Sequence, residues 1–493
     1  MSSGACSSAP SFLLEAVLAD IDPKSGFADL AEARRLFELQ HRASRADGIA
    51  GLALRRDRLR RLGGMVREHA HALADAVCAD FGTRSRTETE LLELAPTLSA
   101  VQHAEAQLAR WMKPEQRRVG IRFKPGKAWV RHEPLGVIGI ISPWNYPLQL
   151  ALSPAIDALA AGNRAMLKPS ELTPAFSALL QRLVAERFDP AELAVVTGGV
   201  EIGQAFAALP FDHLLFTGST AVGRLVYQTA AANLTPVTLE LGGKSPALLC
   251  PDYPIAKAAR SIAWGKFINA GQTCIAPDYV LAPRDQAEPL ARAILEQARR
   301  SYPAVADNDQ YSAIISPRHQ ERLLRAIEAA RAEGAQVLTH EDAGTRERGK
   351  IGPTVLLDAP ASSLFLSEEI FGPVLPIVPY DRIEDALAFI AEHERPLALY
   401  CFTGDRRMQE QVLGGALSGG VTLNGTIVHV AQEDLPFGGV GPSGIGAYHG
   451  REGFRRFSHA RAVHKVGFFN ALEQMGPPWG KLAGQVAKGF LKS

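Results

Sequence analysis

Cys274 lies in the segment FINAGQTCIAPDYVL, residues 267–281, behind a short polar turn and ahead of an apolar stretch. Most free cysteines are inert, buried side chains, and a thiol acts as a nucleophile only after it becomes a thiolate. A turn that contains Gly271 exposes the sulfur to a substrate, which makes Cys274 a candidate nucleophile. The other four cysteines have no such context and are interpreted as structural: Cys6, Cys78, Cys250 and Cys401.

Two further polar side chains follow apolar segments that are typical of strands. Glu240 in TLELGGKSPALL ends one such segment before a turn at Gly242. A carboxylate in a dry cleft has a raised pKa and suits a general base. Asn145 in ISPWNYP follows another segment, and an amide in a rigid loop can donate a hydrogen bond to an oxyanion. Each residue alone is equally compatible with a salt bridge or a capped turn.

The segment HLLFTGSTAVGRLVYQ, residues 213–228, predicts a strand, a turn and a helix with small residues at Gly218, Ser219 and Gly223. Such a turn brings backbone amides and a helix N-terminus to a pyrophosphate. Its spacing is one residue longer than the Rossmann pattern, so a plain strand–helix turn stays an alternative. The literal GxGxxG match at residues 439–444 follows no strand, and we reject it as a dinucleotide site.

The elements that must position these residues fall into two series. Residues 28–112 predict helices, and residues 123–134 predict an exposed hairpin with Pro and Gly at its turn. From Leu135 onward, short apolar runs alternate with amphipathic helices, which predicts parallel, doubly wound sheets. We expect two α/β lobes joined near residue 243 and an amphipathic helix in the C-terminal tail.

Composition excludes several classes of protein. The 493 residues include 53 basic and 52 acidic side chains, so no overall field attracts nucleic acid or an anionic membrane. Five scattered cysteines without a CxxC pair favour a reducing, cytoplasmic location, and the N-terminus lacks a signal-peptide pattern. We expect no membrane span.

The sequence also lacks the motifs of two enzyme classes. It contains no HExxH and no Cys/His cluster, which argues against a catalytic zinc, and no GxSxG, which argues against a serine hydrolase.

Seven motifs decide between these possibilities. They occur in a fixed order across residues 143–444: PWNYP, KPSE, FTGSTAVG, ELGGKSP, AGQTC, EEIFGPV and PFGGVGPSG. This series resembles that of the aldehyde dehydrogenase superfamily, and residues 421–459 most resemble its class 3 branch. Residues 122–154 are similar to bacterial coniferyl aldehyde dehydrogenases.

The resemblance implies an α/β fold of two doubly wound domains plus a small β oligomerisation arm. It places the NAD(P)-binding domain in residues 1–115 and 136–243 and the catalytic domain in residues 244–445. Residues 116–135 and 446–493 would form the arm and the C-terminal tail. The 123–134 hairpin and a strand near 459–467 would pair subunits, so a homodimer is expected.

The resemblance also implies roles for the candidate residues. Cys274 would form a thiohemiacetal and then a thioester, with the oxyanion held by the Asn145 amide and the Cys274 backbone N–H. Glu240 would activate the hydrolytic water. Cofactor contacts would come from Trp144, Lys168, Ser170, Glu171, Gly218, Ser219, Gly223, Glu369 and Phe371. A carboxylate at Glu171 should disfavour a 2′-phosphate, so NAD is preferred and NADP is possible.

Two other functions stay open at this point. A CoA-acylating aldehyde dehydrogenase would usually lack a glutamate at the position of Glu240. A pseudoenzyme would bind the dinucleotide without turnover. The resemblance favours an aromatic, coniferyl aldehyde-like substrate, with a medium-chain aldehyde as the alternative. Specificity would come from loops near Trp144, Tyr146, Gln272 and residues 427–435.

Overall fold

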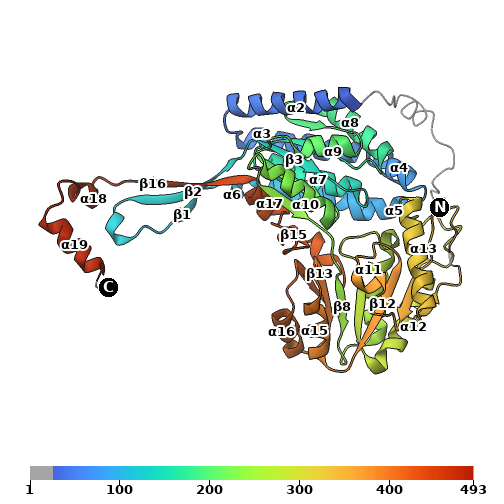
Figure 1. Cartoon of the computed structure of the whole chain (residues 1–493). Helices are drawn as coiled ribbons and strands as arrows, with labels where there is room; N and C mark the ends of the chain where they lie inside the picture. Colours follow the sequence, from blue (N-terminus) through green and yellow to red (C-terminus); the bar gives the residue numbers. More distant parts are fainter. Residues whose placement is uncertain (1–25, 343, 492–493) are drawn as a thin grey trace.

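The computed structural model of the chain describes residues 26–342 and 344–491. It consists of two α/β lobes and a narrow arm that extends away from them (Figure 1). Cys6 and the N-terminal segment discussed above lie outside the described residues. None of the described helices combines the length and the apolar composition that crossing a membrane requires.

The first lobe is built on a six-stranded sheet that is parallel except for one short strand. Its apolar strands are buried on both faces, as a parallel sheet covered by helices requires. The strand order is β15 (Gly444–Ile445), β7 (Val237–Glu240), β6 (His213–Thr217), β3 (Val137–Ile141), β4 (Arg164–Lys168), β5 (Leu193–Val195).

The second lobe is built on a seven-stranded sheet in which only β10 is antiparallel to its neighbour. Its order is β10 (Gln336–Thr339), β11 (Thr354–Leu357), β12 (Val374–Tyr380), β9 (Tyr279–Pro283), β8 (Pro246–Leu249), β13 (Ala398–Phe402), β14 (Gly420–Leu423). The predicted change from one lobe to the other near residue 243 falls in the turn between β7 and β8.

Helices flank both sheets, and several begin at residues that favour helix starts. Pro147 and Pro174 occupy the first helical positions of α7 and α8, where the missing N–H costs nothing. The helices before β3 are α2 (Gly26–Ala46), α3 (Leu52–Glu68), α4 (Ala70–Phe81), α5 (Arg86–Thr89), the π-helix η1 (Glu90–Leu94), α6 (Ala95–Trp111) and η2 (Ile121–Phe123).

The helices after β3 alternate with the strands of both lobes. They are α7 (Pro147–Ala160), α8 (Pro174–Arg187), α9 (Val200–Ala207), α10 (Thr220–Ala231), α11 (Ile255–Phe267), η3 (Ile268–Gly271), α12 (Arg284–Ser301), α13 (Pro317–Ala332), α14 (Leu364–Ser367), α15 (Ile383–Glu392), α16 (Arg406–Gly415), η4 (Val428–Ala431), α17 (Gly450–Arg456), α18 (Ala471–Gln474) and α19 (Lys481–Leu491).

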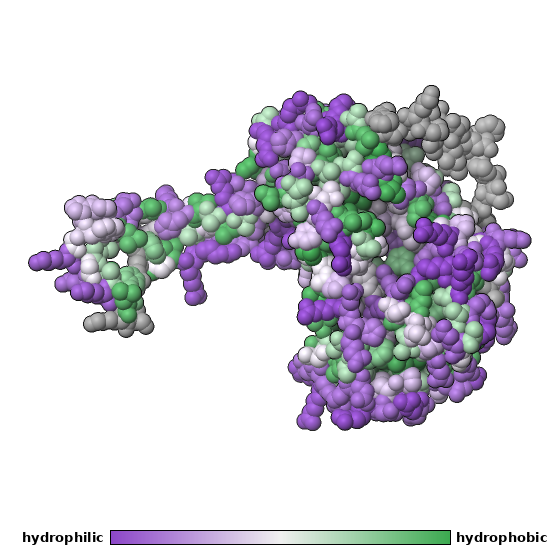
Figure 2. Space-filling view, in the orientation of Figure 1, coloured by the Kyte–Doolittle hydropathy of each residue, from purple (hydrophilic) through white to green (hydrophobic). Residues whose placement is uncertain are grey.

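The arm is a three-stranded antiparallel sheet of β1 (Glu115–Arg117), β2 (Lys127–Pro134) and β16 (Ser458–Lys465). The expected hairpin within residues 123–134 is wrong in detail, because Pro125 and Gly126 precede β2 and the hairpin partner is β1. Figure 2 shows hydrophobic side chains scattered along the arm as far as the C-terminal helices. The arm therefore exposes apolar surface that the two lobes do not cover.

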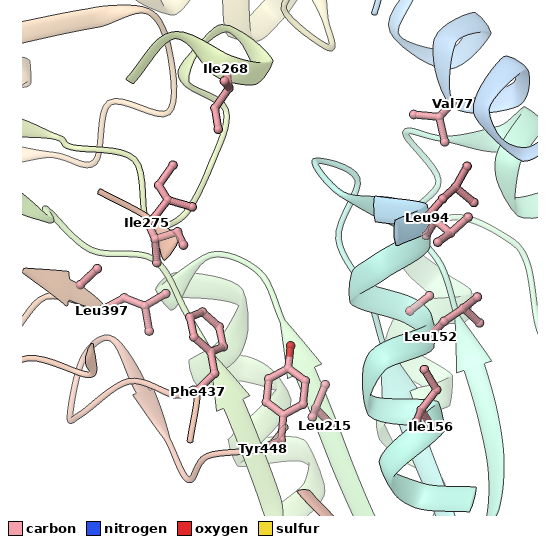
Figure 3. Packing of buried hydrophobic residues seen from close by; sticks show 14 of the residues in the cluster. Val77, Leu94, Leu152, Ile156, Leu215, Ile268, Ile275, Leu397, Phe437 and Tyr448 are labelled. Carbon is pink, nitrogen blue, oxygen red and sulfur yellow. The ribbon is translucent and has the colours of Figure 1, made fainter. Parts of the chain in front are cut away.

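One hydrophobic core cluster runs through both lobes. Leu94, Leu152 and Ile156 from the first lobe belong to it together with Ile275 and Leu397 from the second (Figure 3). Burial of apolar side chains is the main favourable term in folding. A shared cluster therefore fixes the two lobes, and the loops between them, relative to each other.

Candidate active site

The sequence-predicted residues meet at the carboxyl edge of the six-stranded sheet. Strands β3, β4, β6 and β7 all end there, and Lys168 and Glu240 are the last residues of β4 and β7. The chain proceeds outward from β3 in one direction and from β6 in the other, so the order reverses between them. Ligands of open α/β sheets bind at such a reversal.

Cys274 is held at the end of a backbone loop with an unusual conformation. Asn269, Ala270 and Gly271 have positive φ values of 47°, 50° and 75°. For an alanine this conformation costs about 1–2 kcal/mol, so other contacts must hold it. A Cβ at Gly271 would lie 2.2 Å from the carbonyl oxygen of Gly372, which explains the glycine.

Gln272 provides those contacts from a fully buried position. Its side-chain amide donates to the carbonyls of Asn269 at 3.0 Å and Ala313 at 2.9 Å. Its Oε1 accepts from the N–H of Ile315 at 2.9 Å. The Gln272 side chain is thus fully used in fixing the loop and does not offer a free group to a substrate, in contrast to its expected place in the substrate funnel.

Two buried carboxylates lie near the thiol of Cys274. Burial, together with the charges of Glu369 and Glu240, raises the pKa of this thiol to about 12. Both carboxylate oxygens of Glu240 lack a hydrogen-bond partner among the described residues, although the side chain is only 2% exposed. Burial raises the pKa of Glu240 well above its usual value, and Arg456 partly opposes this.

Glu369 comes from the second lobe. Burial and then Asp278 raise its pKa to about 8, against the opposing effects of the Gly243 N–H and two lysines. Its Oε1 is a buried oxygen without a partner in the described structure. Buried polar atoms are normally hydrogen-bonded, so unpartnered oxygens on both Glu240 and Glu369 mark this place as a ligand site.

Asn145 reaches the same place from the loop after β3. Its side-chain amide donates to the carbonyl of Gln272 at 3.1 Å, two residues before Cys274. Its own carbonyl accepts from Arg84 at 2.8 Å and from the Asn269 side chain at 3.0 Å. The structure therefore joins the Asn145 loop directly to the Cys274 loop.

The predicted cofactor residues occupy two neighbouring regions. Lys168 and Glu171 form an ion pair at 3.4 Å beyond the end of β4, and burial lowers the lysine pKa. Ser170 lies between them and accepts from the N–H of Leu172. The rings of Trp144 and Phe371 meet edge to face at 5.4 Å, close to the glutamate at position 369. In the sheet, strands β3 and β6 lie between β4, which ends at Lys168, and β7, which ends at Glu240.

The glycine turn after β6 has the conformation expected from the sequence. Ser219 caps α10 by accepting from the N–H of Val222 at 3.4 Å. A Cβ at Gly218 would lie 2.6 Å from the Phe216 ring, and one at Gly223 would lie 2.5 Å from Leu241. The two glycines thus allow the turn and α10 to pack closely against Phe216 and Leu241.

Known proteins with a similar chain share one family. The aldehyde dehydrogenase family model matches residues 28–463. This chain belongs to the aldehyde dehydrogenase family. It is 47% identical over 453 residues to a probable coniferyl aldehyde dehydrogenase of Pseudomonas aeruginosa, covering 92% of this chain and 95% of that protein. It is 46% identical over 420 residues to a coniferyl aldehyde dehydrogenase of a Pseudomonas species, covering 84% and 87%.

The solved structures that resemble this chain are also aldehyde dehydrogenases. The substrate-bound state of Staphylococcus aureus AldH has a TM-score of 0.87 at 34% identity and covers 93% of this chain and 99% of that one. An NAD+ complex of a Mycobacterium tuberculosis aldehyde dehydrogenase has a TM-score of 0.79 at 30% identity and covers 89% and 90%. The predicted family and α/β fold are confirmed, and the chain is an NAD(P)-dependent aldehyde oxidoreductase.

Sequence reasoning missed two contributors to the aldehyde dehydrogenase site. Tyr448 is buried, and Glu240 and Cys274 both act on its pKa, so its ring lies near them. Lys244 pairs with Asp278 at 2.5 Å, and Asp278 accepts from the N–H of Ile370 at 3.0 Å, which fixes the loop that carries Glu369. Lys244 is part of the quoted ELGGKSP motif, but no local pattern marks Tyr448.

No cluster with metal-ligand geometry occurs within residues 26–342 and 344–491.

Proposed function

We propose that this enzyme oxidises an aromatic aldehyde of the coniferyl aldehyde type to the carboxylic acid, with NAD as the cofactor. The observation that carries the mechanism is the Cys274 thiol beside Glu240, a buried carboxylate without a partner. The substrate class is supported by the names of the relatives that are 46–47% identical.

In the first step the Cys274 thiol loses its proton to water, and the thiolate sulfur bonds to the aldehyde carbon while the carbonyl electron pair moves to oxygen. The resulting thiohemiacetal oxyanion accepts hydrogen bonds from the Asn145 amide and the Cys274 backbone N–H. Preorganised donors of this kind each contribute about 10²–10³-fold to the rate. The nicotinamide, when bound, supplies the hydride acceptor and a positive charge that favours the thiolate.

In the second half-reaction the carbonyl carbon of the substrate is bound to the Cys274 sulfur as a thioester. Glu240 takes a proton from a water molecule, whose oxygen attacks the thioester carbon. The carbon–sulfur bond then breaks, and the acid leaves while the sulfur regains its starting state. A raised pKa suits this proton transfer, because it makes the Glu240 carboxylate a stronger base toward water, and the protonated carboxyl can then return the proton.

The residues present fit a dinucleotide. The N-terminus of α10 with Gly218, Ser219 and Gly223 would hold the pyrophosphate, and the unpartnered Oε1 of Glu369 would accept from the nicotinamide ribose. Trp144, Lys168, Ser170, Glu171 and Phe371 would complete the site. Glu171 is 43% exposed and pairs with Lys168 through Oε2, so its other oxygen would accept from the adenosine ribose and repel a 2′-phosphate. NAD is therefore the proposed cofactor.

The proposal includes a homodimer in the cytoplasm. Strand β16 is an edge strand of the exposed arm sheet, and such an edge pairs readily with a second chain. Cys250, Cys274 and Cys401 are free thiols, which suits a reducing compartment, whereas Cys78 is disulfide-bonded.

The test is the formation of reduced cofactor from coniferyl aldehyde with NAD and NADP in separate assays. Cys274→Ala should lower kcat by at least about 10³-fold. Cys401 is a buried cysteine on β13, and Cys401→Ala should retain activity.

Identification of the product as the free acid in the presence of CoA excludes the acylating reaction. A strong preference for short alkanals contradicts the substrate class, and no turnover across an aldehyde panel supports a dinucleotide-binding pseudoenzyme.

A further inference from the structure

A buried cluster of charges lies behind the two loops that carry Asn145 and Cys274. Arg84, Glu88 and Glu93, named here the Arg84 cluster, come from α5, η1 and the residues just before them. Their segment includes a π-helical turn, a feature that occurs frequently at functional sites. No residue of the cluster is among those with a catalytic or cofactor role proposed above.

Arg84 is the centre of the cluster and has a fully buried side chain. Its Nη1 donates to the carbonyl of Asn145 at 2.8 Å. Its guanidinium pairs with Glu93 at 3.0 Å and lies 4.0 Å from Glu88. The same group packs over the rings of Phe81 and Tyr146, at 4.9 and 5.0 Å from their centroids.

Each carboxylate of the cluster holds a different loop. Glu88 accepts from the backbone N–H of Asn269 at 2.9 Å, at the start of the left-handed turn that leads to Cys274. Glu93 accepts from the N–H groups of Leu148 at 2.8 Å and Gln149 at 3.3 Å, at the start of α7 directly after the Asn145 loop. The two loops belong to different lobes.

A purely structural role would not require charges here. Buried ion pairs contribute little net stability compared with well-packed apolar residues, because desolvation offsets their attraction. What a charged cluster provides is a fixed direction for each hydrogen bond. Here the Arg84 guanidinium donates one hydrogen bond to the Asn145 carbonyl and forms ion pairs with the two carboxylates. The carboxylates in turn accept from the backbone on either side of the site.

We propose that the Arg84 cluster positions the Asn145 amide relative to the Cys274 sulfur, and so sets the geometry in which the oxyanion is bound. Arg84, Glu88 and Glu93 act through Asn145 and the Asn269 turn, so they are positioning residues. The proposal rests on the proposed function in one respect, the role of Asn145 as an oxyanion donor.

The test is a double-mutant cycle in the full-length enzyme between Arg84→Lys and Asn145→Ala. A lysine keeps the charge but lacks the fork that reaches Asn145 and Glu93 together. Asn145→Ala should lower kcat by about 10²-fold, the usual effect of losing one oxyanion donor. Arg84→Lys should lower kcat by about tenfold alone and by less than about twofold in the Asn145→Ala background, because residues that act as a unit are not additive.

Arg58→Lys is the matched control, because Arg58 is also buried and paired, with Glu192 at 3.0 Å, but contacts neither loop. It should lower the melting temperature as much as Arg84→Lys and leave kcat unchanged.

Glu88→Gln is the second variant if Arg84→Lys fails to fold. It keeps the acceptor for Asn269 but removes the charge, and it should also be non-additive with Asn145→Ala.

The outcomes separate the two proposals. Full additivity of Arg84→Lys and Asn145→Ala overturns the positioning role and leaves the proposed function intact. Unchanged kcat in Arg84→Lys or Glu88→Gln overturns it as well. Unchanged kcat in Asn145→Ala, with loss of activity in Cys274→Ala, shows instead that the oxyanion assignment of the proposed function is wrong.

Discussion

The Cys274 thiol is protonated in the protein alone, and this sets its chemistry. Burial and two nearby carboxylates raise its pKa to about 12. A nucleophile in this state reacts only after its surroundings change. The enzyme therefore controls when the sulfur becomes reactive, and the charge of Glu369 is part of that control.

Glu369→Gln should speed alkylation of Cys274 by iodoacetamide above pH 8. The pKa of Glu369 is raised to about 8, so its carboxylate becomes charged as the pH rises through that value and then opposes the thiolate. Removing the charge should increase the rate about three- to tenfold at pH 9, since one pKa unit changes the thiolate fraction tenfold.

At pH 6 the wild-type carboxyl is protonated, so the variant and the wild type should react at nearly equal rates. Glu368→Gln is the control, because Glu368 is 64% exposed and has no part in the pKa of Cys274. A rate ratio that does not change between pH 6 and pH 9 would show that Glu369 is too far from the sulfur to matter.

Glu240→Gln should separate the two half-reactions. If Glu240 is the base for thioester hydrolysis, the variant should still release about one equivalent of reduced cofactor in a rapid burst. Its steady-state rate should then fall by about 10²–10⁴-fold. Glu369→Gln should instead raise the KM for NAD. Stopped-flow absorbance distinguishes them. A retained burst with slow steady-state turnover in Glu369→Gln, together with full turnover in Glu240→Gln, would reverse the two roles.

At the scale of elements, the turn before Cys274 places the sulfur. Gly271→Ala should lower kcat strongly, because a Cβ there would meet the Gly372 carbonyl at 2.2 Å and φ is +75°. Gly203→Ala in α9 is the control, because nothing lies within 4 Å of its Cβ. Equal effects of both variants on kcat would contradict the role of the turn.

The sequence predicts those elements that carry their own local signals. Apolar runs between helices predict both parallel sheets, and Gly218 with Ser219 predicts the strand–turn–helix before α10. The Arg84 cluster has no such signal. The segment RSRTETELLELA looks like an ordinary amphipathic helix with solvent-exposed charges. Arg84 and Glu93 are buried only because the loop after β3, at least 55 residues away in the chain, packs on them.

Contacts between distant segments also explain the other surprises. The glycine-rich loop at 439–444, rejected as a dinucleotide site, returns to the first lobe and pairs there, with Gly444 beside Glu240. This pairing holds the end of β7, which carries the candidate base Glu240, in place. Tyr448 reaches the site through the same return of the chain. Neither placement can be derived from spacing, because both depend on the closing of two lobes around one core.

For the whole molecule, the arm predicts the assembly. The arm sheet leaves β16 as an open edge, and Ile121 at its loop is 83% exposed. We expect light scattering after gel filtration to give twice the 53.0 kDa mass of one chain. Ile121→Glu should shift the protein toward the monomer, because an interface cannot bury an unpaired carboxylate cheaply.

Leu234→Glu is the matched control for this shift. Leu234 is 90% exposed but follows α10 in the first lobe and is not part of the arm sheet, so its substitution should leave the mass unchanged. A dimer that withstands Ile121→Glu but dissociates with Leu234→Glu would place the interface on the first lobe. A single-chain mass at every concentration would mean that the open edge of β16 is not used for pairing.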